Sequence, residues 1–103
     1  MTLNYQPASP STTEFDELAD RIQQQFDDAV VSGTDQELFY AGYLNGHFSL
    51  VFSVALKEGN LTLDALDKGM LLGLQQAFAN NELEEADQQG VVAYWQQVVA
   101  TVA

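Results

Sequence analysis

The sequence of 103 residues contains no cysteine, and this absence excludes several kinds of chemistry. Without thiols the chain can form no disulfide framework, no thiolate zinc site and no cysteine nucleophile. The lack of disulfides fits a reducing compartment. The N-terminal stretch MTLNYQPASP also lacks the basic start and the apolar core of a signal peptide. We therefore expect a cytoplasmic protein.

Basic residues are scarce. Arg21, Lys57 and Lys68 are outnumbered by fifteen Asp and Glu residues, and the formal net charge is −12. Because nucleic-acid affinity depends on neutralising phosphates, we expect no nucleic-acid partner, and binding to an anionic membrane is disfavoured for the same reason. The acidity is consistent with a basic protein partner or a cation. It is also explained by solubility through mutual repulsion, which is the interpretation we favour.

Long hydrophobic runs and prolines are scarce as well. The longest apolar run, FSLVFSVAL, is interrupted by serines and is far shorter than the ~20 residues of a membrane span, so we expect no membrane insertion. Both prolines, Pro7 and Pro10, lie in the first ten residues. We predict a mobile N-terminal tail over residues 1–11 and a single helical domain over residues 12–103.

The apolar residues that are present recur at spacings of three and four, the period of an amphipathic helix. A cap on Ser11, paired with Glu14, or on Thr12 starts the first helix, which we expect to end at Gly33 as a left-handed cap. The apolar stripe of this helix consists of Phe15, Leu18, Ile22, Phe26 and Ala29/Val30.

The second helix starts at Thr34 or Asp35, with Thr34 and Glu37 at capping-box spacing, and stops at Gly59. It is apolar on most of its circumference. We therefore predict that it is the central and most buried helix.

The third helix begins near Thr62 and is closed by the turn-forming Asn80 and Asn81. The fourth begins in the acidic segment 84–87, where carboxylates suit the positive end of a helix dipole. The valines of GVVAYWQQVVATV also suit a strand, but their spacing is helical rather than alternating. Four amphipathic helices joined by short turns predict an all-α fold, a compact antiparallel four-helix bundle with up-down-up-down topology.

The stretch ELFYAGYLNGHFSL holds two glycines inside the second helix. At about 100° per residue, Gly42, Gly46, Ser49 and Ser53 share one narrow strip. Each glycine costs about 1 kcal/mol relative to alanine, so a close approach of two helices is the expected compensation. Gly69 and Gly73 repeat the spacing on the third helix. We expect the two strips to meet inside the bundle; the alternatives are that one strip faces a second subunit or that the glycines are merely tolerated.

The single histidine, His47, lies on the opposite side of this helix from the glycine strip, near Tyr40 and Tyr43. We expect a partly buried imidazole bonded to a carbonyl, a tyrosine hydroxyl or an acidic side chain. The alternative is a ligand contact in an interhelical pocket near Tyr43 and His47.

The segment DQELFYAGYLNGHFSLVFSVALKEGN resembles the signature of the YfcL-like family of small uncharacterised bacterial proteins. The resemblance is carried by Glu37-Leu38-Phe39, Gly42-Tyr43-Leu44, Gly46-His47 and Leu50, and weaker similarity extends from about Phe15 across the other helices. LEEADQQ, at the start of the fourth helix, departs from the family in lacking a Ser-Pro start. The resemblance implies a compact α-helical, cytoplasmic protein and supplies no activity. It also suggests that Gly42, Tyr43, Gly46 and His47 form one candidate helix-packing or interaction motif.

Parts for catalysis or metal binding are scarce. The only imidazole sits on an apolar helix face, no nucleophile elbow is visible, and there is no phosphate-binding glycine loop. Carboxylate pairs such as Asp16/Asp20 share a helix face, but one histidine without cysteine provides too few ligands for a zinc site. We expect no enzyme activity, no metal and no cofactor.

These observations favour an interaction module that binds an unidentified protein partner or a second copy of itself. The alternative is a small-molecule binding protein with a pocket between helices near Tyr43 and His47.

Overall fold

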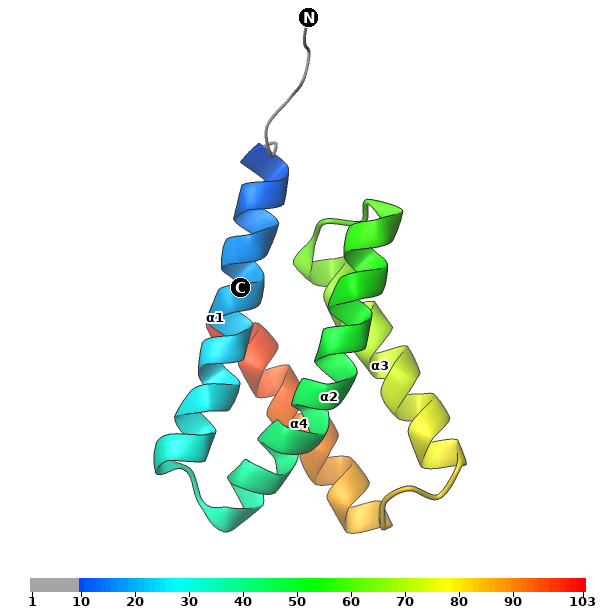
Figure 1. The fold of residues 1–103 in the computed structure, drawn as a ribbon. Coiled ribbons are helices and arrows are strands. Elements are labelled where there is room, and N and C mark those ends of the chain that lie inside the picture. The colour runs from blue at the N-terminus through cyan, green and yellow to red at the C-terminus, as the bar shows by residue number, and fades with distance from the viewer. Residues whose placement is uncertain (1–9) are drawn as a thin grey trace, which may run out of the picture.

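The computed structural model describes the backbone of residues 10–103 and the side chains of residues 13–103. It contains the helices α1 (Pro10–Ser32), α2 (Asp35–Glu58), α3 (Leu63–Ala79) and α4 (Glu85–Val102), and no strand within residues 10–103. The chain turns back at each connection: the α1–α2 and α3–α4 connections lie at one end of the molecule and the α2–α3 connection at the other (Figure 1). The predicted all-α fold is confirmed, including the helix in the valine-rich segment.

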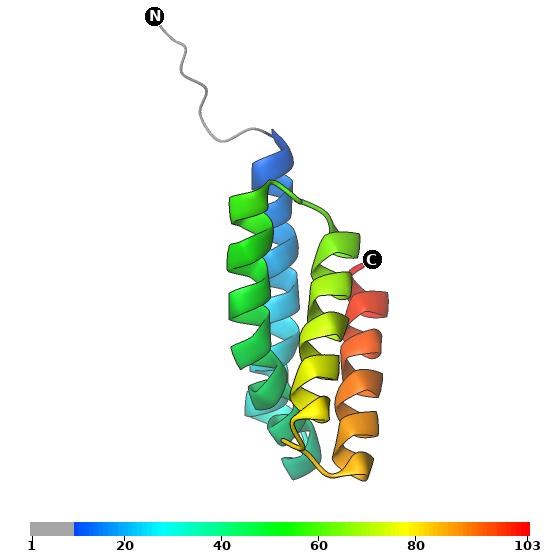
Figure 2. The ribbon, with the colours of Figure 1, turned by 90° about the vertical axis from the view of Figure 1, so that its right-hand side faces the viewer.

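The four helices pack as a compact bundle, as predicted. Both α2 and α4 contact each of the other three helices. In the view of Figure 1, α2 lies in front of α4, with α1 and α3 on either side. Figure 2 shows the helices running along a common long axis.

Each helix contributes one apolar stripe to a single core. The stripe predicted for the first helix lies in or against this core, except for Val30, which is 61% exposed. Trp95 is fully buried, and its indole Nε1–H donates to Asp67 Oδ1 of α3 over 2.8 Å. The largest fully buried side chains are Phe15, Ile22, Phe26, Leu44, Leu66, Met70, Leu74, Val91, Trp95 and Val98.

Local capping sets most helix boundaries where the sequence predicts them. The Glu37 N–H donates to Thr34 Oγ1 (3.1 Å) and the Thr34 N–H donates to Glu37 Oε1 (2.9 Å), which completes the expected capping box of α2. Gly59, with φ 76°, ends α2 in the left-handed region. Thr62 Oγ1 accepts the Ala65 N–H at the start of α3 (3.1 Å), and Asn81, with φ 60°, lies in the turn after it.

The start of α1 differs from the prediction. The helix begins at Pro10, so residues 10 and 11 belong to it rather than to the tail, and neither Ser11 nor Thr12 is its N-cap. Proline suits the first helical position, because no intrahelical acceptor would take an N–H there. Residues 1–9 of the predicted tail lie outside the described residues.

Gly33 follows the end of α1 as expected, but it is not left-handed: Gly59 is the glycine with positive φ among the described residues. Gly33 instead allows a close contact between its own backbone and the preceding turn of α1. The Gly33 N–H donates to the Ala29 carbonyl over 2.9 Å, and a Cβ at position 33 would lie 2.6 Å from that oxygen.

The prediction that α2 is the most buried helix is wrong. Its buried residues are Ala41, Leu44, Phe48 and Ala55, whereas Leu38, Phe39, Leu50, Val54 and Leu56 are between 43% and 66% exposed. The physical reason is that the neighbouring helices cover one side of α2. On the other side, the described helices leave apolar side chains such as Leu50 and Val54 largely uncovered.

Candidate functional site

One side of α2 points away from the bundle and carries apolar and small residues. No Asp, Glu, Lys or Arg occurs from Leu38 to Leu56. At about 100° per residue, the residues of this side lie opposite the buried Leu44 and Phe48. We define the outer face of α2 as Phe39, Gly42, Tyr43, Gly46, Leu50, Ser53 and Val54.

The outer face is accessible over most of its length. Leu50 is 66% exposed, Val54 44% and Phe39 43%, and Gly42, Gly46 and Ser53 are exposed as well. No other described helix passes in front of α2 in the view of Figure 1. Single exposed apolar residues are ordinary on a protein surface, but a contiguous group of them is typical of an interaction surface.

The glycine strips of α2 and α3 do not meet, so the expected contact between them inside the bundle is wrong. Among the described residues, nothing lies within 4 Å of a Cβ built at Gly42 or Gly46. The α3 strip instead makes room for large α2 side chains: a Cβ at Gly69 would lie 2.7 Å from Val51 Cγ1, and one at Gly73 would lie 3.9 Å from His47 Nδ1. Contact with a second subunit and mere tolerance remain as explanations for the α2 strip.

Tyr43 and His47 lie at the edge of α2 that faces α3. The Tyr43 hydroxyl donates to Glu82 Oε1 over 2.9 Å, which ties α2 to the connection between α3 and α4. Burial, followed by the hydrogen bond to Glu82 and the charge of its carboxylate, raises the pKa of Tyr43 to about 12. The rings of Tyr43 and His47 are in contact, with centroids 4.8 Å apart.

His47 is partly buried, as predicted, but the expected hydrogen bond is not formed. No hydrogen bond among the side chains of residues 13–103 involves its imidazole, and the Tyr43 hydroxyl donates to Glu82 instead. Because the imidazole is only partly buried, water can satisfy its nitrogens.

A groove of about 330 Å³ runs between α2 and α3 beside the outer face. Leu50, Val54 and Leu72 line it, together with Gly69 and Gly73. Its lining includes neither Tyr43 nor His47. The groove therefore extends the apolar surface of α2 toward α3 rather than forming a pocket around the tyrosine and the histidine.

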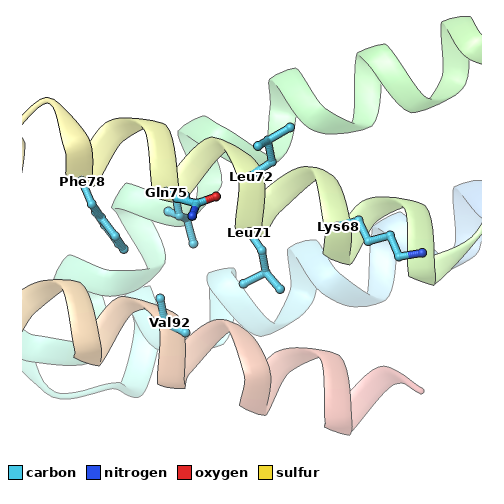
Figure 3. A pocket seen from close by; sticks show the side chains of 7 residues that line it. Lys68, Leu71, Leu72, Gln75, Phe78 and Val92 are labelled. Carbon is cyan, nitrogen blue, oxygen red and sulfur yellow. The ribbon is translucent and has the colours of Figure 1, made fainter.

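Leu72 also borders a second hollow of about 520 Å³, between α3 and α4. Figure 3 shows Leu71 and Phe78 of α3 on the side of α4, which carries Val92, whereas Leu72 points to the opposite side of α3. The exposed apolar surface thus extends from α2 across α3.

The chemistry available on this surface is apolar contact and hydrogen bonding. Within residues 13–103, no group of three or more His, Asp or Glu side chains is placed to hold a metal ion. Over residues 10–103, every helix falls short of the length or the apolar content that crossing a membrane requires.

The sequence predicts one helix for the four motif residues, Gly42, Tyr43, Gly46 and His47, but it does not indicate which residues of other elements lie next to them. Glu82 lies in a connection, and no local pattern indicates its contact with Tyr43. The three-and-four spacing predicts the apolar stripe of the third helix as Leu63, Leu66, Met70, Leu74, Ala77 and Phe78. Leu72 falls outside this stripe, and a leucine off the stripe is expected to be exposed.

Comparison with known proteins agrees with the sequence resemblance. The family described as "YfcL protein" matches residues 16–100. Over 80 residues the chain is 30% identical to "Uncharacterized protein YfcL" of Escherichia coli (strain K12), a match that covers 78% of this chain and 87% of that protein. No solved structure matches the chain. On the extent of the family match, the chain belongs to the YfcL family.

Proposed function

We propose that the protein is a non-catalytic interaction module of the cytoplasm that binds a protein through the outer face of α2. One observation carries the proposal. A chain of net charge −12 has no charged residue from Leu38 to Leu56, and it leaves Phe39, Leu50 and Val54 of this segment exposed. A partner that covered these side chains would gain about 25 cal/mol for each Å² of apolar surface removed from water. It would have no charge on this stretch to desolvate.

A small-molecule site near Tyr43 and His47 is the alternative. It has less support, because the groove beside the outer face includes neither residue and the Tyr43 hydroxyl is already bonded to Glu82. Chemical-shift mapping with a panel of metabolites separates the two functions. Shifts confined to Tyr43, His47 and Glu82 would favour the small-molecule site.

Retention of a partner by matched variants tests the proposal. Leu50→Ser and Val31→Ser each remove an exposed apolar side chain, at positions 66% and 85% exposed, but only Leu50 belongs to the outer face. The full-length chain is used as bait in a lysate of the organism that encodes it, and circular dichroism verifies the fold of each variant. We expect the wild type and Val31→Ser to retain the same protein, and Leu50→Ser to lose it.

Two outcomes contradict the proposal. One is equal retention by both variants, because the binding surface would then lie elsewhere. The other is a wild-type chain that retains no protein and does not associate with itself.

A further inference from the structure

We propose that the outer face of α2 binds a second copy of the chain, packed antiparallel with the two-fold axis close to Gly46. This inference rests on the proposed function, because it names the partner of the same face. The order of charged, large and small residues along α2 carries it.

Charge along α2 is self-complementary about Gly46. In a pair related by a two-fold axis, if residue i of one copy contacts residue j of the other, then residue j of the first copy contacts residue i of the second. Asp35 and Lys57 are each eleven residues from Gly46, both are exposed, and both fall on the side of α2 that carries the outer face. Asp35 of each copy then lies opposite Lys57 of the other.

Lys57 is available for this contact. Among residues 13–103 one ion pair forms, between Lys68 Nζ and Asp64 Oδ2 at 2.9 Å. Lys57 is not part of it. The dimer thus pairs one of the three basic residues of an acidic chain.

Side-chain size is complementary in the same register. Gly42 and Leu50 are each four residues from Gly46, so the exposed Leu50 of one copy lies opposite the open space at Gly42 of the other. Phe39 and Ser53 are each seven residues away and are matched in the same manner. At the axis, Gly46 of one copy faces Gly46 of the other. Because neither residue has a Cβ, the two backbones can come closest there.

The distribution of acidic residues favours an antiparallel over a parallel pair. Eight of the fifteen lie within about two helical turns of the α1–α2 and α3–α4 connections, which share one end of the bundle, and no basic residue lies among them (Figure 1). They are Asp27, Asp28, Asp35, Glu37, Glu82, Glu84, Glu85 and Asp87. An antiparallel pair keeps the two acidic ends apart, whereas a parallel pair superposes them. A basic partner would be drawn to this end rather than to the uncharged outer face.

Sedimentation of the full chain over a range of concentrations tests the association. We expect the wild type to dimerise reversibly and Leu50→Asp to raise the dimer dissociation constant at least about tenfold, because it places a charge in the centre of the contact. Val31→Asp introduces the same charge at an exposed apolar position outside the face and should leave the dissociation constant unchanged. A wild type that stays monomeric at high concentration overturns the inference.

A single cysteine tests the position of the axis, because the chain has none of its own. Gly46→Cys enters open space, so the fold should tolerate it, and the two thiols would face each other across the axis. We expect rapid formation of a disulfide-linked dimer under mild oxidation, and slow cross-linking by Val31→Cys. Equal rates for the two variants contradict the register.

Charge reversal tests the direction of packing. Asp35→Lys and Lys57→Asp should each weaken the dimer, and the double variant should restore it, because each reversed residue again meets its opposite. Additive weakening in the double variant contradicts the antiparallel pair.

Two further results separate this inference from the proposed function. If the chain is monomeric but Leu50→Ser still loses another protein in the retention experiment, the interaction module stands and the second-copy inference fails. The salt dependence of binding also distinguishes the two. Added salt should strengthen the association of two acidic copies because it screens their mutual repulsion, whereas it should weaken the binding of a basic partner.

Discussion

At the residue scale, the helical glycines of the chain have opposite surroundings. A Cβ at Gly42 or Gly46 would meet open space, whereas one at Gly90 would overlap the hydroxyl and ring of Tyr40. Tyr40 in turn packs against Tyr94, with ring centroids 6.2 Å apart. Sequence alone cannot distinguish these glycines, because their difference depends on a helix that is distant along the chain.

This difference predicts stability changes of opposite sign. Gly42→Ala should raise the free energy of unfolding by up to about 1 kcal/mol, because alanine favours the helix and its methyl group would meet no atom of the residues that the structure describes. Gly90→Ala should lower it by about 1–2 kcal/mol, because displacing Tyr40 costs more than the helix gains. Urea unfolding at low protein concentration measures both changes without a contribution from self-association. Changes of the same sign would contradict the packing at Gly90.

The bond from Trp95 to Asp67 predicts a second pair of stabilities. Asp67→Ala leaves the buried indole N–H without an acceptor and should cost about 1–3 kcal/mol. Asp67→Asn keeps a carbonyl oxygen in place and should cost less. Denaturant unfolding followed by the fluorescence of the single tryptophan measures both. Equal losses for the two variants would show that this hydrogen bond contributes little.

Tyr43 predicts a loss of stability at high pH. Its pKa in the folded chain is raised from 10.0 to about 12, so its stabilising contribution is complete below pH 10.0 and is lost as the pH rises toward about 12. Tyr43→Phe, which cannot ionise, should lose less stability over this interval than the wild type. The check is a series of urea unfolding curves across the interval, and parallel losses would contradict the raised pKa.

At the scale of the elements, the helix boundaries were largely predictable because local backbone chemistry sets them. Thr34, Gly59 and Thr62 each act where their side chain or their tolerance of positive φ predicts. The prediction of a left-handed Gly33 is wrong because glycine also permits close contacts: the Gly33 backbone packs on Ala29 without a positive φ. A glycine at this position correctly indicates the end of α1, but the sequence does not show whether the glycine adopts a positive φ or makes room for a close contact.

The exposure of α2 was not predictable for a different reason. An apolar helix surface indicates that something should cover it, but not which molecule provides the cover. The sequence therefore predicts that the apolar circumference of α2 lies in the core, whereas Leu50 and Val54 are exposed in the structure. The candidate motif itself could be placed on one helix, whereas Glu82 could not be added, because it is 39 residues from Tyr43.

The capping box predicts that α2 depends on Thr34. Thr34→Ala removes the acceptor of the Glu37 N–H and should lower the free energy of unfolding by about 1 kcal/mol. Ser53→Ala, an exposed change inside the same helix, is the control and should have a small effect. Thermal melts followed by circular dichroism make the comparison. A loss no larger than that of the control would show that α2 does not need its cap.

At the scale of the whole molecule, the charge of −12 opposes the compact state. Adding salt screens this repulsion over about 10 Å at 0.1 M, so sodium chloride should raise the midpoint of thermal unfolding. Melts of the Leu50→Asp variant, which we expect to be monomeric, separate this effect from self-association. A midpoint that falls as salt is added would indicate that favourable ion pairs outweigh the repulsion.

The gathering of acidic residues around two connections gives the bundle a permanent electric moment along its length. A single copy that approaches a cationic support, such as an anion-exchange bead, should therefore attach by the end that carries these connections. Its long axis would then point away from the support. The opposite tip, with the turn from Glu58 to Leu63, would then project into solution. Labels for surface-based measurements are best placed at that tip, because adsorption leaves it free.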